Sequence, residues 1–110
     1  MERVVLVYTT YPSLVEAEKA GRAVVEERLA ACVNILPGMV SHYWWEGKIE
    51  RGQEAVMIVK TRASFSDRVR KALKASHPNK TPAIMVVPTE MVEDTYLRWI
   101  MQETDRNVMA

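Results

Sequence analysis

The sequence has little of several features that would place it in a particular class of protein. Its 110 residues contain one cysteine, so no disulfide can form within the chain, which fits a reducing compartment. No apolar run approaches the roughly 18 residues that a membrane span needs, and no secretory-type apolar segment is present. The formal net charge is +1, which gives no electrostatic basis for binding nucleic acid or an anionic membrane. We therefore expect a cytoplasmic protein that has neither nucleic acid nor a membrane as a partner.

Catalytic motifs are also missing. The sequence contains no Ser-His-Asp context, no nucleophile elbow, no glycine-rich phosphate loop and no defensible pair of carboxylates. The two histidines, His42 and His77, are far apart and form neither an HxH nor an HExxH motif. We therefore predict that the protein is not an enzyme.

What the sequence does contain predicts one folded domain over residues 1–110. Its hydrophobic fraction of 48% and charged fraction of 26% are typical of globular chains. Short apolar runs predict strands, and apolar residues at helical spacing predict helices. The expected strands are 4–8, 31–36, 40–50, 55–60 and 83–87; the expected helices begin at a Ser13–Glu16 capping box, begin at Ser64 or Ser66, and span 93–103.

Taken together these elements follow the order strand, helix, strand, strand, helix, strand, helix. This order predicts an α+β fold of the ferredoxin-like split β-α-β type, with a four-stranded sheet and one helix added at the C-terminus. In such a fold an antiparallel sheet carries its helices on one face. Gly21 lies inside the first helix, where it lowers helix propensity, and we expect it to allow close packing against the sheet. RNA-recognition modules share this fold, but the aromatic pattern that they carry is absent from residues 55–60.

Residues 29–61 hold the features around which the fold is organised. The run 31–36 ends in Pro37-Gly38, which predicts a turn, and Gly47 would allow a bend or bulge in the run 40–50. Both faces of 55–60 are mostly apolar, which predicts that both sides of the sheet are covered. The run 40–50 would extend about 36 Å, longer than a typical strand, and its overhang could pair with a second chain. We infer a homo-oligomer.

Short motifs spread over nearly the whole chain form a pattern in a fixed order. They are Leu29-Ala30-Ala31-Cys32-Val33-Asn34-Ile35, Ser41, Tyr43, Trp45, Glu46-Gly47-Lys48, Glu54, Lys60-Thr61, His77-Pro78, Pro82 and Tyr96-Leu97-Arg98-Trp99. Together they resemble the signature of the CutA divalent-cation tolerance proteins. The resemblance implies a homotrimer with sheet-lined interfaces and a role in the response to divalent metal ions, copper above all.

Cys32 and His77 are the candidate metal ligands. A cysteine thiolate is a soft ligand for copper; the alternative is that Cys32 is a small buried strand residue. The residues alone favour the structural role of Cys32, and the resemblance brings copper nearer to equal with it. The resemblance also matches His77 to a His-Pro motif, whereas a histidine at a helix C-terminus suits the helix dipole. Without a second cysteine, no closed zinc site is expected, and copper or another divalent ion would not be required for folding. Asn79 and Ala83 depart from the residues common in the family, which puts a metal site around that loop in doubt.

The resemblance also implies that Tyr43, Trp45, Glu54, Lys60 and Thr61 line a ligand cleft between subunits. Lys60 ends an apolar strand, where its ammonium group would serve an anionic ligand or pair with Glu54. The alternative is an intersubunit salt bridge with aromatic packing. Three functions stay open: a metal-tolerance protein that binds copper, a small-molecule or anion sensor like the trimeric nitrogen-regulatory PII proteins, and a scaffold that assembles other proteins.

Overall fold

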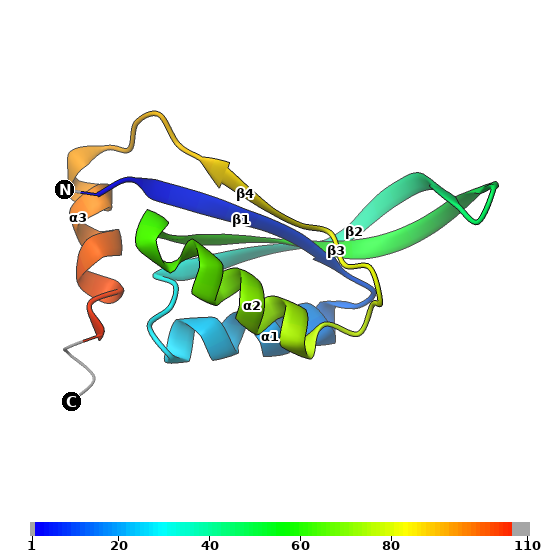
Figure 1. The fold of residues 1–110 in the computed structure, drawn as a ribbon, viewed down its shortest axis with the longest axis horizontal. Helices are drawn as coiled ribbons and strands as arrows, with labels where there is room; N and C mark the ends of the chain where they lie inside the picture. The colour runs from blue at the N-terminus through cyan, green and yellow to red at the C-terminus, as the bar shows by residue number, and fades with distance from the viewer. Residues whose placement is uncertain (1, 107–110) are drawn as a thin grey trace.

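In the part of the chain that the structure describes, four antiparallel strands form a sheet and three α-helices pack around it (Figure 1). The computed structural model describes residues 2–106. In chain order the elements are β1 (Val4–Tyr11), α1 (Leu14–Glu26), β2 (Cys32–Trp45), β3 (Lys48–Arg62), a short 3-10 helix (Ala63–Phe65), α2 (Ser66–Ser76), β4 (Ile84–Pro88) and α3 (Asp94–Glu103). The strand order is β2-β3-β1-β4, and every neighbouring pair is antiparallel. This arrangement confirms the predicted ferredoxin-like fold with an added helix.

Helices α1 and α2 cover one face of the sheet because alternate strand residues on that face are apolar. Val7 of β1 and both Met57 and Val59 of β3 are fully buried there. They pack in one cluster with Val24 of α1 and Leu73 of α2. This cluster is the main hydrophobic core, and it leaves the opposite face of the sheet to other contacts.

Helix α1 lies close to the sheet at Gly21. A Cβ atom at this position would be 2.8 Å from both Met57 Sδ and Val33 Cγ2, which is too close for a real contact. The predicted reason for this glycine, close packing, is confirmed. The predicted start of the helix is confirmed as well: Ser13 Oγ accepts a hydrogen bond from the Glu16 N–H at 3.2 Å and donates one to the Glu16 carboxylate at 2.8 Å.

Strands β2 and β3 form one long hairpin, and this corrects two predictions. The run 40–50 is not a single strand, because the chain reverses at Glu46 and Gly47, whose φ angles of 50° and 80° suit a type I′ turn. Pro37-Gly38 is not a turn, because β2 continues through it. The two residues form a β-bulge opposite Ala55, with Gly38 at φ 77°. Proline and glycine mark an interruption of the strand ladder, but not whether the chain turns back.

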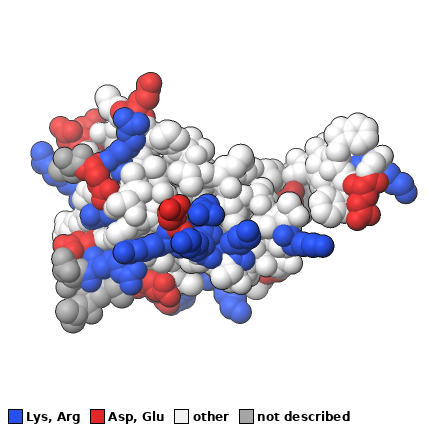
Figure 2. Space-filling view, viewed as in Figure 1, with Lys and Arg blue, Asp and Glu red and all other residues white. Residues whose placement is uncertain are grey.

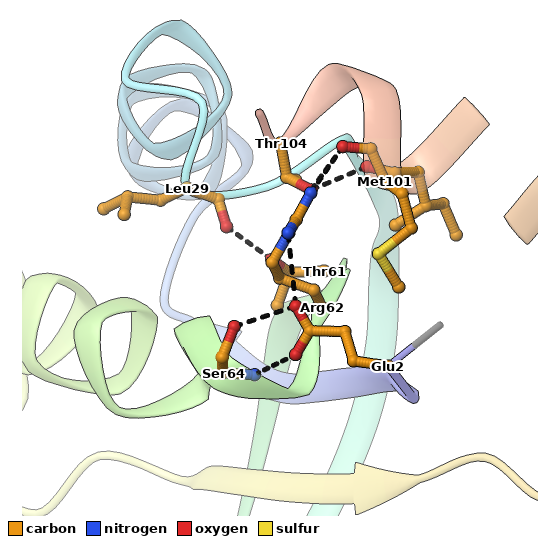
Figure 3. Close-up of polar contacts among 8 residues, drawn as sticks. Glu2, Leu29, Thr61, Arg62, Ser64, Met101 and Thr104 are labelled. Atoms are coloured by element: carbon orange, nitrogen blue, oxygen red, sulfur yellow. Dashed lines mark hydrogen bonds and ion pairs between the residues drawn. The ribbon is translucent and has the colours of Figure 1, made fainter. Parts of the chain in front are cut away.

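The start of α2 also differs from the prediction, since neither Ser64 nor Ser66 caps it. The helix follows the 3-10 turn, its N-cap is Phe65, and no side chain makes a capping hydrogen bond. Ser64 instead donates from its N–H and its Oγ to the Glu2 carboxylate, at 3.1 and 2.9 Å (Figure 3). The Glu2 carboxylate therefore accepts hydrogen bonds from a serine that the sequence pattern predicts as a helix cap.

The second face of the sheet is largely open within one chain. The side chains of Leu36, Met85 and Val87 on this face are 55%, 54% and 45% exposed. Helix α3 covers only one end of the sheet, where Ile100 is buried near Ala31. The hairpin extends away from the body, and the molecule measures 46 × 30 × 22 Å (Figure 1). The expected cover of this face does not come from the described part of the chain, and the homotrimer stays a prediction.

The helical layer presents charged groups at the surface. Figure 2 shows lysine and arginine side chains along α2, which carries Arg68, Arg70, Lys71 and Lys74 against one acidic residue, Asp67. Such a polar outer stripe is typical of a helix that packs one face on a core. Within residues 2–106, none of the helices combines the length and the apolar character needed to cross a membrane.

Candidate functional site

A groove lies at the base of the β2-β3 hairpin. Its volume is about 810 Å³, within the range typical of small-molecule sites. The hairpin and β1 form one side of it, and the loop 78–83 between α2 and β4 forms the other. The lining residues that matter most for its chemistry are Tyr8, Met39, Tyr43, Trp45, Glu54 and Lys80.

Strand alternation places three of the predicted cleft residues, Tyr43, Trp45 and Glu54, around this groove. The Tyr43 ring lies over Gly52, 3.9 Å from the point where a Cβ atom would stand. Tyr43 and Trp45 are 45% and 48% exposed, so part of each ring is open to a ligand in the single chain. Three of the five residues that the resemblance implies for the cleft therefore line this groove within one chain, and their role as a ligand site stays a prediction.

Glu54 is the partly buried charged group of the groove. Its carboxylate forms no hydrogen bond or ion pair with any residue between 2 and 106, and its partner on β2 is the apolar Met39. Met39 is itself engaged, since its sulfur accepts a hydrogen bond from the Tyr8 hydroxyl at 3.7 Å. Lys80, the other charged residue of the lining, is exposed on the loop. The groove thus combines aromatic rings with a half-buried carboxylate and a solvated ammonium group.

The other two predicted cleft residues, Lys60 and Thr61, lie toward the opposite end of β3. Lys60 is six residues from Glu54, which corresponds to about 20 Å along a strand. Thr61 is fully buried, and its Oγ1 donates a hydrogen bond to the Leu29 carbonyl at 2.6 Å. Within one chain neither residue lines the groove. A cleft that joins Lys60 to the groove residues would require a second subunit, and Thr61 is enclosed by its own chain.

Cys32, Lys60 and Tyr96 form a polar cluster where α3 approaches the sheet. Cys32 and Lys60 are direct partners across β2 and β3. Lys60 Nζ donates a hydrogen bond to the Tyr96 hydroxyl at 3.0 Å, and Cys32 Sγ is 3.8 Å from the same oxygen. The hydrogen bond to Tyr96 raises the pKa of Lys60. Cys32 is partly exposed, so its thiol is not closed off by its own chain.

His77 follows α2, and both of its ring nitrogens are engaged. Nδ1 accepts a hydrogen bond from the Asn79 N–H at 3.0 Å, so Nε2 carries the hydrogen and donates to the Thr10 carbonyl at 2.7 Å. The ring stacks on Tyr11 with centroids 4.3 Å apart. Burial raises the pKa of Tyr11 to about 12. A metal ion at His77 would have to displace one of these two hydrogen bonds.

The two predicted metal ligands do not meet in one chain. Cys32 pairs with Lys60 on β3, whereas His77 contacts Thr10, whose partner on β3 lies four residues away, about 13 Å. The Tyr11 ring that supports His77 belongs to the helix-side core, and Cys32 is not part of that core. Across residues 2–106, no group of three or more His, Cys, Asp and Glu side chains is arranged to hold a metal ion. The donors of a single chain therefore do not fit a closed metal site.

The residues that sequence reasoning missed are those that hold α3 in place. Arg62 at the end of β3 donates hydrogen bonds to Thr104 Oγ1 at 2.8 Å, to Glu2 at 3.2 Å and to the Met101 carbonyl at 2.5 Å (Figure 3). By fixing α3, this network positions Tyr96, which helical spacing predicts only as a packing residue. No local signal marks these contacts, because their partners are 39 to 60 residues apart in the chain.

The fold and the order of the motifs place the chain among small ferredoxin-like proteins with a projecting hairpin. A family model described as "CutA1 divalent ion tolerance protein" matches residues 5–103. The divalent-cation tolerance protein CutA of Archaeoglobus fulgidus is 48% identical over 94 residues, which cover 86% of this chain and 91% of the relative. The solved structure of the periplasmic divalent cation tolerance protein CutA from the same organism has a TM-score of 0.89 and 44% identity, covering 93% of this chain and 99% of that one.

Some relatives are longer. The chloroplastic Protein CutA 1 of Oryza sativa is 37% identical over 100 residues, and these cover 91% of this chain but 56% of the relative. The shared region is therefore the domain described above. The chain belongs to the CutA1 divalent ion tolerance family, which confirms the resemblance found in the sequence.

Proposed function

We propose that this chain is a non-enzymatic, cytoplasmic homotrimer that acts in tolerance of divalent metal ions and binds copper through Cys32. The observation that carries the proposal is the match of the CutA1 family model to residues 5–103. Relatives over this region are named for divalent-cation tolerance. The copper part of the proposal draws its support from the partly exposed Cys32 thiol, a soft donor suited to copper.

The open face of the sheet supports the oligomer. A cluster of exposed apolar side chains on a monomer usually marks a contact surface. The projecting hairpin offers a second chain a further surface to pack against (Figure 1). Light scattering after size-exclusion chromatography tests this directly. The expected mass is three times that of the 12.6 kDa chain. A monomer at micromolar concentration would contradict the proposal.

Copper at Cys32 needs donors beyond those of its own chain. His77 is remote from Cys32, and its two nitrogens already have partners. We therefore propose that a second subunit completes the coordination of a copper ion at Cys32. It follows that Cys32→Ser should weaken copper binding more than His77→Ala does.

Calorimetric titration of the metal-free protein with Cu(I) and Cu(II) tests the copper site. Cys32→Ser and His77→Ala are compared with His42→Ala, a control that removes an exposed histidine on the hairpin. We expect micromolar or tighter binding, about −8 kcal/mol or better, that is lost in Cys32→Ser and kept in His42→Ala. Tight binding that survives Cys32→Ser would refute Cys32 as a ligand, and tight binding that survives His77→Ala would refute His77. A lack of copper binding would refute the proposal that the protein binds copper, but not the proposal that it acts in divalent-metal tolerance.

A second candidate function is sensing of a small molecule, and the groove at the hairpin base favours it. The groove has the volume of a small-molecule site and carries Tyr43, Trp45 and Glu54. If the ligand is an anion bound between subunits, Lys60→Ala should weaken its binding and Cys32→Ser should not. A protein that serves only as a scaffold should be indifferent to both substitutions.

A further inference from the structure

We propose that the groove at the hairpin base binds a small organic cation of the alkylammonium class, with its charged head against Glu54 and the rings of Tyr43 and Trp45. The proposal rests on the second candidate function, that the groove takes a small molecule, and adds the charge that this molecule carries. It differs from the anionic ligand that the sequence led us to expect.

The aromatic side of the groove suits a cation. Tyr43 and Trp45 are two residues apart on β2, share one face of the strand and line the groove together. The faces of tyrosine and tryptophan rings attract ammonium groups through the ring quadrupole. Because the Tyr43 ring rests over Gly52 at 3.9 Å, the backbone of β3 sets its position before any ligand arrives. The groove therefore offers two preformed ring surfaces.

Glu54 determines the sign of the charge. Its carboxylate is half-buried and has no hydrogen bond or ion pair within residues 2–106, a situation that a bound cation would relieve. Lys80 has no ion pair there either, but it is exposed, so water stabilises its ammonium group. Lys60, the cation that an anion site would use, is about 20 Å away along β3. Within one chain, the charge that the groove leaves uncompensated is negative.

Charged residues nearer the hairpin tip do not alter this balance. Glu50 is the cross-strand partner of Tyr43, and Lys48 is the partner of Trp45. They contribute one charge of each sign to the same face of β3, but Glu50 is four residues from Glu54 and Lys48 is six, about 13 and 20 Å along the strand. The nearer acidic group therefore outweighs the basic one. The preference for a cation thus depends on Glu54 and is opposed by Lys80.

The test uses three probes of known charge at constant ionic strength: tetramethylammonium, the uncharged tert-butanol of similar shape, and inorganic phosphate. Binding is followed by the NMR signal of the Trp45 indole N–H, identified with Trp45→Phe. We expect a saturable shift with tetramethylammonium and none with the other two probes. Glu54→Gln should weaken this binding about tenfold, the effect of losing about 1.4 kcal/mol. Lys80→Gln, the matched control of opposite charge, should tighten it or leave it unchanged.

Each other outcome overturns the proposal in a distinguishable way. Equal binding of tetramethylammonium and tert-butanol would show an apolar site without charge selection. Phosphate binding that Lys80→Gln abolishes would overturn the cation while leaving small-molecule sensing intact. If no probe binds and Glu54→Gln lowers the mass measured by light scattering, the carboxylate faces a basic side chain of a second copy, and both the cation and the sensor are refuted. If no probe binds and the mass is unchanged, both are refuted as well.

Discussion

Lys60 of β3 donates a hydrogen bond to the hydroxyl of Tyr96 in α3 at 3.0 Å, and its Nζ lies 5.3 Å from the centre of the same ring. The pair joins the C-terminal helix to the sheet beside Cys32. Tyr96 therefore acts on Lys60 in two ways, as a hydrogen-bond acceptor and as an aromatic surface. A substitution that keeps the ring and removes the hydroxyl separates the two.

Tyr96→Phe is expected to lower the pKa of Lys60 toward its ordinary value of 10.5, because the hydrogen bond to Tyr96 is the largest cause of its rise. A lysine whose pKa is raised by folding adds stability below its unfolded pKa, and this contribution disappears as the pH rises through the folded pKa. The stability lost in Tyr96→Phe should be below about 1 kcal/mol at neutral pH, because the pair is partly exposed. NMR titration of the Lys60 side chain measures the shift. An unchanged Lys60 pKa would contradict this role of the hydroxyl, and Tyr43→Phe controls for general effects.

Tyr11→Phe is expected to preserve stability at neutral pH or raise it by up to about 1 kcal/mol. The Tyr11 hydroxyl is buried and finds no hydrogen-bond partner within residues 2–106. Removing it therefore removes the free-energy cost of burying an unpaired polar group. Burial raises the pKa of Tyr11 from 10.0 to about 12, so the folded state holds a proton that the unfolded chain releases. Wild-type stability should therefore fall as the pH rises through this interval, by up to about 2–3 kcal/mol.

Urea unfolding at neutral and at strongly alkaline pH checks this second prediction. Tyr11→Phe should lack the tyrosine-linked part of the alkaline loss, and Tyr43→Phe, which alters an exposed tyrosine, should retain it. A loss above about 1 kcal/mol in Tyr11→Phe at neutral pH would mean that the hydroxyl is satisfied in solution.

Gly21→Ala is expected to destabilise the fold by about 1–3 kcal/mol, although alanine is the better helix former by about 1 kcal/mol. The new methyl group would stand 2.8 Å from Val33 Cγ2 and Met57 Sδ, and the branched valine has little freedom to move away. Ala23→Gly, at an exposed position of the same helix, is the matched control and should lose about 1 kcal/mol through propensity alone. A Gly21→Ala variant that unfolds at higher urea than wild type would refute the close packing of α1.

Thr104→Val is expected to cost about 1–3 kcal/mol, because it leaves the Arg62 Nε–H without its acceptor in a buried place. Thermal unfolding measures the loss, and Thr95→Val, on the exposed side of α3, should change stability by less than about 0.5 kcal/mol.

Thr104→Val should also loosen α3 and so speed the reaction of the Cys32 thiol with a labelling reagent. Unaltered labelling would show that Arg62 does not control access to Cys32.

The fold was predictable because the sequence patterns that mark its strands and helices are local. Each signal, such as the Ser13–Glu16 capping box or an apolar strand run, is contained in a stretch of a few residues. The order of these signals along the chain then selects the topology. The errors fell where one local signal permits two structures. Pro37-Gly38 suits a bulge as well as a turn, and Gly47 suits a complete reversal as well as a bend.

The candidate site was less predictable because it depends on contacts between distant segments. The family resemblance implied Tyr43 and Trp45 as cleft residues, but nothing in the sequence placed the loop around Lys80 across from them. The same limit applies to Cys32 and His77: residue chemistry nominated both as ligands, whereas strand register holds them apart within one chain. Register and helix docking are properties of the whole fold.

The bulge at Pro37-Gly38 changes the phase of β2. Before it, even-numbered residues such as Cys32 and Leu36 share the face of Lys60 and Val56; after it, odd-numbered residues such as Met39 take that face. The aromatic pair of the groove is odd-numbered and lies on this face because the bulge absorbs one extra residue. A one-residue deletion between 36 and 39 would remove the bulge and leave Met39, Tyr43 and Trp45 opposite Glu54, Glu50 and Lys48 as before. The bulge is thus a place where β2 takes up a change in chain length without altering which side chains face the groove.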